Sequence, residues 1–93
     1  GLPNVLLEAM ASARPVLLSP LPAAQEAVTD GVEGGLTATA HDLEGAVDLL
    51  CQWAPDEERL RQMGTAARAR ALRDHDERVQ ILRMAPLFGA GPV

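Results

Sequence analysis

The sequence has few or none of several residue types, and each shortage excludes a class of function. It has no tyrosine and only two other aromatic residues, Trp53 and Phe88, so bases or sugars have almost nothing to stack on. It has no lysine, and its eight basic residues are all arginines, outnumbered by 13 acids for a net charge of −5. Because nucleic-acid-binding domains usually carry a basic face, this balance predicts no nucleic-acid partner.

Metal-binding and disulfide-forming residues are also scarce. The single cysteine, Cys51, cannot form an internal disulfide, which is typical of a protein from the reducing cytoplasm. Cys51 continues an apolar helical pattern with Val47 and Leu50, which predicts a buried, inert thiol. The two histidines, His41 and His75, have no Cys or His partner at the spacing of zinc ligands, so we expect no metal site.

Long apolar runs are absent, so no segment of the sequence is expected to span a bilayer, and no secretory signal pattern is present. The 93 residues, 47% hydrophobic and 23% charged, have the composition of an ordinary globular protein. The chain begins at Gly1, and a domain of this size buries only roughly 60–65% of the surface that its unfolded chain exposes. We therefore expect it to be part of a larger protein.

Hydrophobic periodicity predicts alternating helices and strands in the first half of the chain. Residues 3–13 have apolar side chains at helical spacing, and the proline that follows ends this helix. Residues 15–19 form a short, continuous apolar run, as in a buried parallel strand. A short helix over residues 23–28 and a second strand over residues 35–39 follow.

The second half is predicted to be helical. A helix begins at Asp42, with candidate caps at residues 39–41, and ends before Pro55. Its apolar stripe, expected to be buried, consists of Leu43, Ala46, Val47, Leu50 and Cys51. Pro55 opens a helix that Gly64 ends, Thr65 caps a helix over residues 66–73, and a last helix runs from about residue 76 to 84, after a turn marked by His75.

Interleaved arginines and acids on these C-terminal helices favour a solvated, ion-paired face. Residues 85–93 are rich in glycine and proline and are predicted to form a flexible tail. The order of elements predicts an α/β fold in which short parallel strands are packed by helices and the C-terminus is helical. Two or three strands do not make a sheet covered on both faces, so further strands are expected from elsewhere.

The most informative segment is G-L-P-N-V-L-L-E-A-M-A, residues 1–11, a loop that leads into an amphipathic helix. The free N–H groups of Leu2, Asn4, Val5 and Leu6 would point out of the helix start, which suits a phosphate or diphosphate. One turn further, the carboxylate of Glu8 could accept hydrogen bonds from two vicinal hydroxyls, as on a ribose. By residue type alone, a solvated glutamate on a surface helix is the favoured interpretation of Glu8.

The run G-L-P-N-V-L-L-E-A-M-A-S-A-R-P-V resembles the second half of the Glu-x7-Glu motif of family 4 glycosyltransferases, retaining enzymes of GT-B fold. Glu8 matches the second glutamate of that motif, and the first would fall immediately before Gly1. Downstream, Glu26-Ala27-Val28 followed by Asp30-Gly31 is similar to a further stretch of the family. Departures are Ala13, where the family prefers glycine, and Pro22-Ala23 and Gln25, where it has a Gly-Gly pair and a proline.

The resemblance implies that residues 1–84 are part of a C-terminal Rossmann-like domain that binds a nucleotide-diphosphate sugar. The stretch Gly1, Leu2, Pro3, Asn4 and Val5 would hold the diphosphate and sugar hydroxyls through its backbone. Glu8 would hold the ribose hydroxyls. The resemblance implies retaining transfer without a metal, a cofactor or a catalytic nucleophile from this segment, which by itself is expected to be inactive.

The resemblance also implies a partner domain. The acceptor would bind to an N-terminal domain of the same protein that is absent from these 93 residues. The expected location is the cytoplasm, with peripheral association at the inner face of the membrane left open through that absent domain. A second interpretation remains open, in which the chain is a non-catalytic truncated remnant or a partner-binding α/β module.

Overall fold

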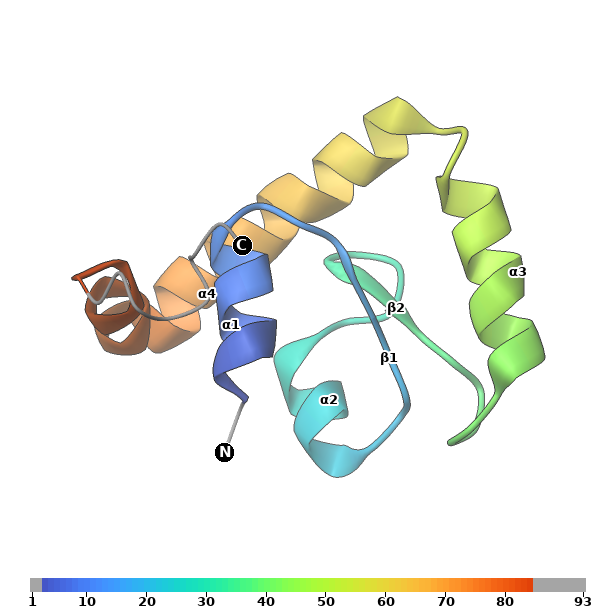
Figure 1. Ribbon diagram of the computed structural model, residues 1–93, viewed down its shortest axis with the longest axis horizontal. Coiled ribbons are helices and arrows are strands. Elements are labelled where there is room, and N and C mark those ends of the chain that lie inside the picture. The colour runs from blue at the N-terminus through green and yellow to red at the C-terminus, as the bar shows by residue number, and fades with distance from the viewer. Residues whose placement is uncertain (1–2, 85–93) are drawn as a thin grey trace.

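The computed structural model describes residues 3–84, and the side chains of residues 3–81. In chain order the elements are α1 (Asn4–Ala11), β1 (Val16–Leu18), α2 (Pro22–Ala27), β2 (Gly34–Leu36), α3 (Leu43–Trp53) and α4 (Glu57–Met84) (Figure 1). The predicted α/β fold with short parallel strands and a helical C-terminal half is confirmed. Gly1, Leu2 and the predicted tail over residues 85–93 lie outside the described residues.

The two strands form a parallel pair in which α2 makes the crossover. Val16 pairs with Gly34 and Leu18 with Leu36, and the Thr37 N–H donates to the Leu18 carbonyl at 2.9 Å. A Cβ at Gly34 would lie 1.8 Å from the Val16 carbonyl oxygen, so this register requires glycine there. α1 and β1 run in opposite directions, and α1 therefore begins on the side of the molecule at which β1 ends (Figure 1).

α4 lies along α1 in the opposite direction, and three contacts mark the alignment. Near one end, a Cβ at Gly64 would lie 2.1 Å from the carbonyl oxygen of Ala13, just past α1. In the middle, the Arg68 guanidinium donates to the carbonyl of Ala11 at 2.7 Å. Near the other end, Arg78 Nη2 donates to Asn4 Oδ1 at 2.6 Å. α4 thus touches α1 from its last turn to its first residue.

The predicted break at Gly64 and the predicted cap at Thr65 are wrong, because α4 continues through both residues. Gly64 does not end the helix. Because it has no side chain, it lets the α4 backbone come close to the turn over residues 12–15. The helix instead departs from helical geometry at His75, with φ −138° and ψ 34°. His75 was expected to mark a turn before the last helix, and this expectation is confirmed.

The core lies between α1, β1, the end of α2 and one face of α4. Its members are buried apolar side chains: Leu7, Met10, Ala11, Val16, Ala27, Val28, Ala67, Ala71 and Val79. Leu7 of α1 and Ala67 and Ala71 of α4 are fully buried. Because alanine is small, the α4 backbone can come close to α1. The helical spacing of residues 3–13 predicted an apolar face of Val5, Leu6, Ala9, Met10 and Ala13, and this is only partly right. Met10 is buried, but Val5 is 81% exposed, and the buried face is completed by Leu7 and Ala11.

α3 contradicts the prediction of a buried stripe. Leu43, Val47 and Leu50 are 75%, 48% and 52% exposed, and Cys51 is an exposed thiol instead of a buried one. The helix packs through its other side, where the Trp53 ring covers Gly35 so closely that a Cβ there would lie 2.8 Å from Cζ2. The described residues therefore cover only part of the apolar surface of α3, and the rest is exposed.

The start of α3 also differs in detail from the expected capping by residues 39–41. Asp42 is the cap, and its Oδ1 accepts a hydrogen bond from the Gly45 N–H at 2.9 Å. His41 precedes it with φ 63°, a left-handed conformation that turns the chain into the helix. β2 ends at Leu36 because the Thr37 hydroxyl donates to the Thr39 carbonyl and starts a local turn.

Candidate functional site

The start of α1 exposes backbone donors that nothing in the helix satisfies. Pro3 is the N-cap, with φ −60° and ψ 142°, and no side chain caps this end. The first helical hydrogen bond runs from the Leu7 N–H to the Pro3 carbonyl at 3.1 Å. The N–H groups of Asn4, Val5 and Leu6 therefore have no acceptor within the helix, and this end carries the positive pole of its dipole.

The surroundings of this end agree with the general location of ligand sites in α/β folds. Ligands of open parallel sheets bind outside the carboxyl ends of the strands. The α1 start lies on the same side of the molecule as that end of β1 (Figure 1). Val5 is 81% exposed and Asn4 is exposed, so the first two residues of α1 lie at the surface of the part of the chain that the structure describes.

Glu8 lies one turn further along α1 and is half-buried. Because residues four apart share a helix face, Glu8 lies on the same side of α1 as Asn4. Its carboxylate makes no hydrogen bond or ion pair with any residue that the structure describes. A half-buried carboxylate without a protein partner has its acceptor oxygens available for a ligand.

The structure thus brings four of the predicted site residues, Pro3, Asn4, Val5 and Glu8, onto the first two turns of α1. Their assignment to a nucleotide sugar stays a prediction. Arg78 is a neighbour of this group that the sequence did not reveal, because 74 positions separate it from Asn4. It was expected to belong to a solvated, ion-paired face, and no local pattern distinguishes it from the other arginines of α4.

The backbone conformation at Ala13 explains why glycine is preferred at this position in the family that the N-terminal run resembles. Ala13 has φ 61°, in the left-handed region that glycine adopts at little cost and alanine at a greater one. The position at which the family of the resemblance prefers glycine is therefore one whose backbone conformation favours glycine. The chain keeps this tight turn between α1 and β1 despite the methyl group.

Arg70 corrects the expectation that the α4 arginines form a solvated face. Its side chain is only 18% exposed, and its guanidinium contacts Glu33 at 3.3 Å, the Glu26 carbonyl at 2.7 Å and Asp74 at 2.8 Å. Glu33 is itself buried and accepts a hydrogen bond from the Thr29 N–H at 2.6 Å. These contacts, first those with Asp74 and then those with Glu33, raise the pKa of Arg70 and join the α2–β2 loop to α4.

The expected solvated pairs do occur elsewhere on α4. Arg61 pairs with Glu58, and both side chains are mostly exposed. Arg73, which is 66% exposed, pairs with Asp74 at 3.0 Å. Hydrogen bonds from Arg73 and then from Arg70 hold the pKa of Asp74 below its ordinary value.

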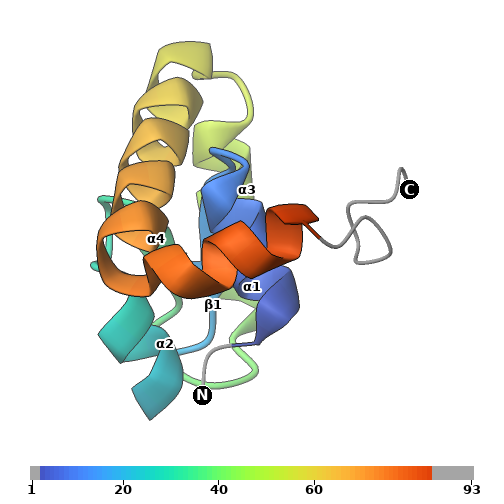
Figure 2. The same cartoon turned by 90° about the vertical axis from the view of Figure 1, so that its left-hand side faces the viewer.

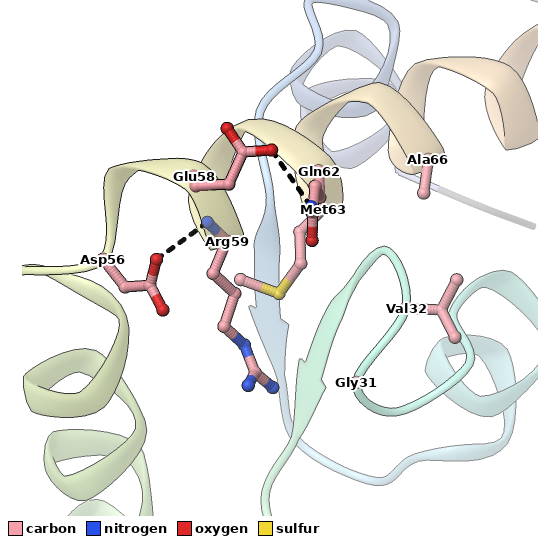
Figure 3. A pocket seen from close by; sticks show the side chains of 8 residues that line it. All are labelled: Gly31, Val32, Asp56, Glu58, Arg59, Gln62, Met63 and Ala66. Carbon is pink, nitrogen blue, oxygen red and sulfur yellow. Dashed lines mark hydrogen bonds between the residues drawn. The ribbon is translucent and has the colours of Figure 1, made fainter.

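Two surface cavities are lined by residues other than those of the α1 start. The first, of about 550 Å³, lies between the loop before β2 and the first turns of α4, and Arg59 extends along it toward β2 (Figure 3). It is lined by Gly31, Val32, Asp56, Glu58, Arg59, Gln62, Met63 and Ala66. The second, of about 390 Å³, lies between the end of β1 and the start of α3. Neither contains a predicted site residue.

Within residues 3–84, no three His, Cys, Asp or Glu side chains gather into a group that could hold a metal ion. None of the helices described here combines the length and the apolar character needed to cross a membrane. The candidate site is therefore the α1 start with Glu8, built from backbone donors and one carboxylate.

The parallel strands, the crossover helix and the uncapped helix α1 define an α/β domain with Rossmann-like features. A family model, glycosyl transferases group 1, matches residues 1–56, which is more than half of the chain. The chain therefore belongs to the group 1 glycosyl transferases. Searches of curated proteins and of solved structures found no significant match.

Proposed function

We propose that this chain is the donor-binding segment of a retaining glycosyltransferase of family 4 and GT-B fold. It would bind a nucleotide-diphosphate sugar from which a hexosyl group is transferred to an acceptor. The observation that carries the proposal is Glu8, a half-buried carboxylate without a partner among the described residues, one turn inside an uncapped helix start. The family match, which includes all of α1, gives this arrangement its chemical context.

In this proposal the start of α1 binds the diphosphate. When the bond between the anomeric carbon and the diphosphate oxygen breaks, that oxygen keeps the electron pair and negative charge grows on the leaving group. The backbone donors of Asn4, Val5 and Leu6 and the helix dipole stabilise that charge. The same end would also bind the ground-state diphosphate, so the gain in rate comes from the part of the interaction that strengthens as charge develops.

Glu8 orients the nucleoside. An ionised carboxylate accepts two hydrogen bonds, and the vicinal hydroxyls of a ribose supply two donors at matching separation. The transferred sugar would be held by a glutamate immediately before Gly1 and by the backbone of residues 1–5. Gly1 and Leu2 belong to the proposed site through the sequence motif alone.

In this proposal the donor and the acceptor bind to different domains, and the acceptor binds to an N-terminal domain. Residues 1–84 would be part of the donor domain, and the acceptor would bind to the other domain, which also accounts for any contact with the inner face of the membrane. Because the acceptor side of the cleft would belong to that other domain, the 93-residue chain alone would not turn over a donor. The proposed location is the cytoplasm, and no metal or cofactor is required, since helix donors and cationic side chains stabilise the leaving group.

The test is a substitution of Glu8 in the full-length protein. Glu8→Ala should weaken binding of the preferred donor, found by screening UDP-, GDP- and ADP-sugars, by about 1.5–3 kcal/mol, since charge-assisted hydrogen bonds are lost. Isothermal titration calorimetry measures the dissociation constant. Glu44→Ala, at an exposed glutamate of α3, is the matched control and should leave it unchanged. An unaltered affinity of the Glu8→Ala protein would remove the ribose role.

A second candidate function is a partner-binding module without chemistry. The exposed apolar stripe Leu43, Val47 and Leu50 favours it, because monomeric proteins rarely leave such a stripe uncovered. The same titration separates the two, since a folded protein that binds none of the sugar nucleotides would support the second candidate.

A further inference from the structure

The bend in α4 brings a basic side chain to the start of α1. Beyond His75 the helix changes direction and crosses α1 (Figure 2). Val79, 2% exposed, belongs to the same buried cluster as Leu7 and Met10, and so anchors this last segment in the core. Arg78, the residue before Val79, donates from Nη2 to Asn4 Oδ1 at 2.6 Å. The contact is thus supported by buried packing next to it in the chain.

This contact fixes the orientation of the Asn4 amide. A guanidinium only donates hydrogen bonds, so the side of the amide that faces Arg78 has to be the carbonyl oxygen. The Nδ2 amino group, with two N–H donors, then faces away from Arg78. Asn4 is also the first residue of α1, and its backbone N–H has no acceptor in the helix. Arg78 therefore adds oriented side-chain donors to an end that already offers backbone donors.

We propose that Arg78 is a positioning residue for the donor diphosphate. It holds the Asn4 amide so that Nδ2 donates to a phosphate oxygen, and its positive charge adds to the field of the helix start. The inference rests on the function proposed above and deepens it. Arg78 lies outside the residues matched by the family model, 1–56, so it is assigned by its contact and not by the match.

Arg68 is the control that distinguishes a purely structural role of Arg78 from a role in binding. Both arginines extend from α4 and donate to α1, at 2.7 Å for Arg68 and 2.6 Å for Arg78. Arg68 reaches the carbonyl of Ala11 at the end of α1, whereas Arg78 reaches the side chain of Asn4 at the start. Removal of either loses an interhelical hydrogen bond, but only Arg78 lies at the proposed diphosphate.

The experiment measures dissociation constants on the intact protein for two probes, the nucleoside diphosphate of the preferred donor and the corresponding nucleoside. Arg78→Ala should weaken the diphosphate about tenfold, as for one lost charge-assisted interaction, and leave the nucleoside unchanged. Arg78→Lys should recover part of the loss. Arg68→Ala should leave both constants unchanged, even where it lowers the melting temperature.

A second substitution separates binding from folding. Asn4→Asp keeps an acceptor for Arg78 and places an acid at a helix start, so the melting temperature should stay equal or rise. It removes the amide donors and repels phosphate, so the diphosphate should bind at least tenfold more weakly. In Arg78→Ala/Asn4→Ala the combined loss should be smaller than the sum of the single losses, because the two residues act as one unit.

The outcomes distinguish this inference from the proposed function. Equal weakening of both probes by Arg78→Ala, no weakening of either, or the same losses for Arg68→Ala would overturn the positioning role. If at the same time Glu8→Ala weakens the nucleoside, the proposed donor site stands and only the role of Arg78 fails. A wild-type protein that binds neither probe overturns both.

Discussion

α1 and α3 have similar hydrophobic periodicity but very different surroundings. α1 buries Leu7 and Met10 to 0% and 1% exposure, whereas α3 leaves Leu43 and Leu50 at 75% and 52%. The difference is the covering layer: α4 lies along α1 from Ala13 to Asn4, while α3 is held mainly through Trp53 against Gly35. Periodicity identifies the apolar face of a helix, and only the neighbouring elements decide whether that face is buried.

The largest expected effect tests this comparison directly. Leu7→Ala should destabilise the protein by about 3–4 kcal/mol, since it leaves a cavity between α1 and α4. Leu50→Ala, at the exposed stripe of α3, should change stability by no more than about 0.5 kcal/mol. Urea unfolding followed by circular dichroism measures both. Equal losses would mean that α3 is covered in solution, for instance by self-association, which sedimentation would detect.

A somewhat smaller effect extends the comparison to charged contacts. Arg70→Ala should cost about 3 kcal/mol, because it leaves Glu33 buried without its cationic partner. Arg73→Ala, at an exposed arginine that pairs with the same Asp74, should cost no more than about 0.5 kcal/mol. The same unfolding assay applies. A neutral Arg70→Ala would show that the α2–β2 loop does not depend on α4.

The smallest effect concerns the exposed pairs of α4. The pKa of Asp74 is lowered by Arg73 and then Arg70, so its contribution to stability is present above its ordinary value of 3.8. It is lost as the pH falls through the lower folded-state pKa. Asp74→Asn should therefore be slightly less stable than wild type at pH 6, and this difference should shrink toward pH 3. A difference that grows on acidification would contradict the assignment.

Local patterns predicted much of the part that surrounds the candidate site. The α1 and β1 residues were found because an apolar helical stripe and a short apolar run lie next to each other, separated by a proline. Glu8 on the first turns of α1 follows from the same periodicity. The N-terminal run predicted a glycosyltransferase, and the match to the group 1 glycosyl transferases confirms this at the level of the group. The assignment to family 4 and the extent of the donor domain over residues 1–84 stay predictions.

The remaining features depend on contacts between distant residues. Gly64 was predicted to end a helix because glycine lowers helix propensity, but the close approach to Ala13 explains its presence inside α4. Cys51 was predicted to be buried because its stripe is apolar, but no described element covers that stripe. Arg70 and Arg78 find their partners 37 and 74 positions away, which no local pattern reveals.

The alignment of α4 along α1 has a consequence for how such a chain can change in length. Gly64 meets the turn just past α1, and Arg78 meets its first residue, so the two segments are matched to each other between fixed points. One residue inserted between positions 64 and 74, in the regular helix before the bend at His75, would rotate everything beyond it by about 100° and advance it by about 1.5 Å. Arg78 would then face away from Asn4, although every individual residue was kept. An insertion in either segment therefore requires a compensating change in the other.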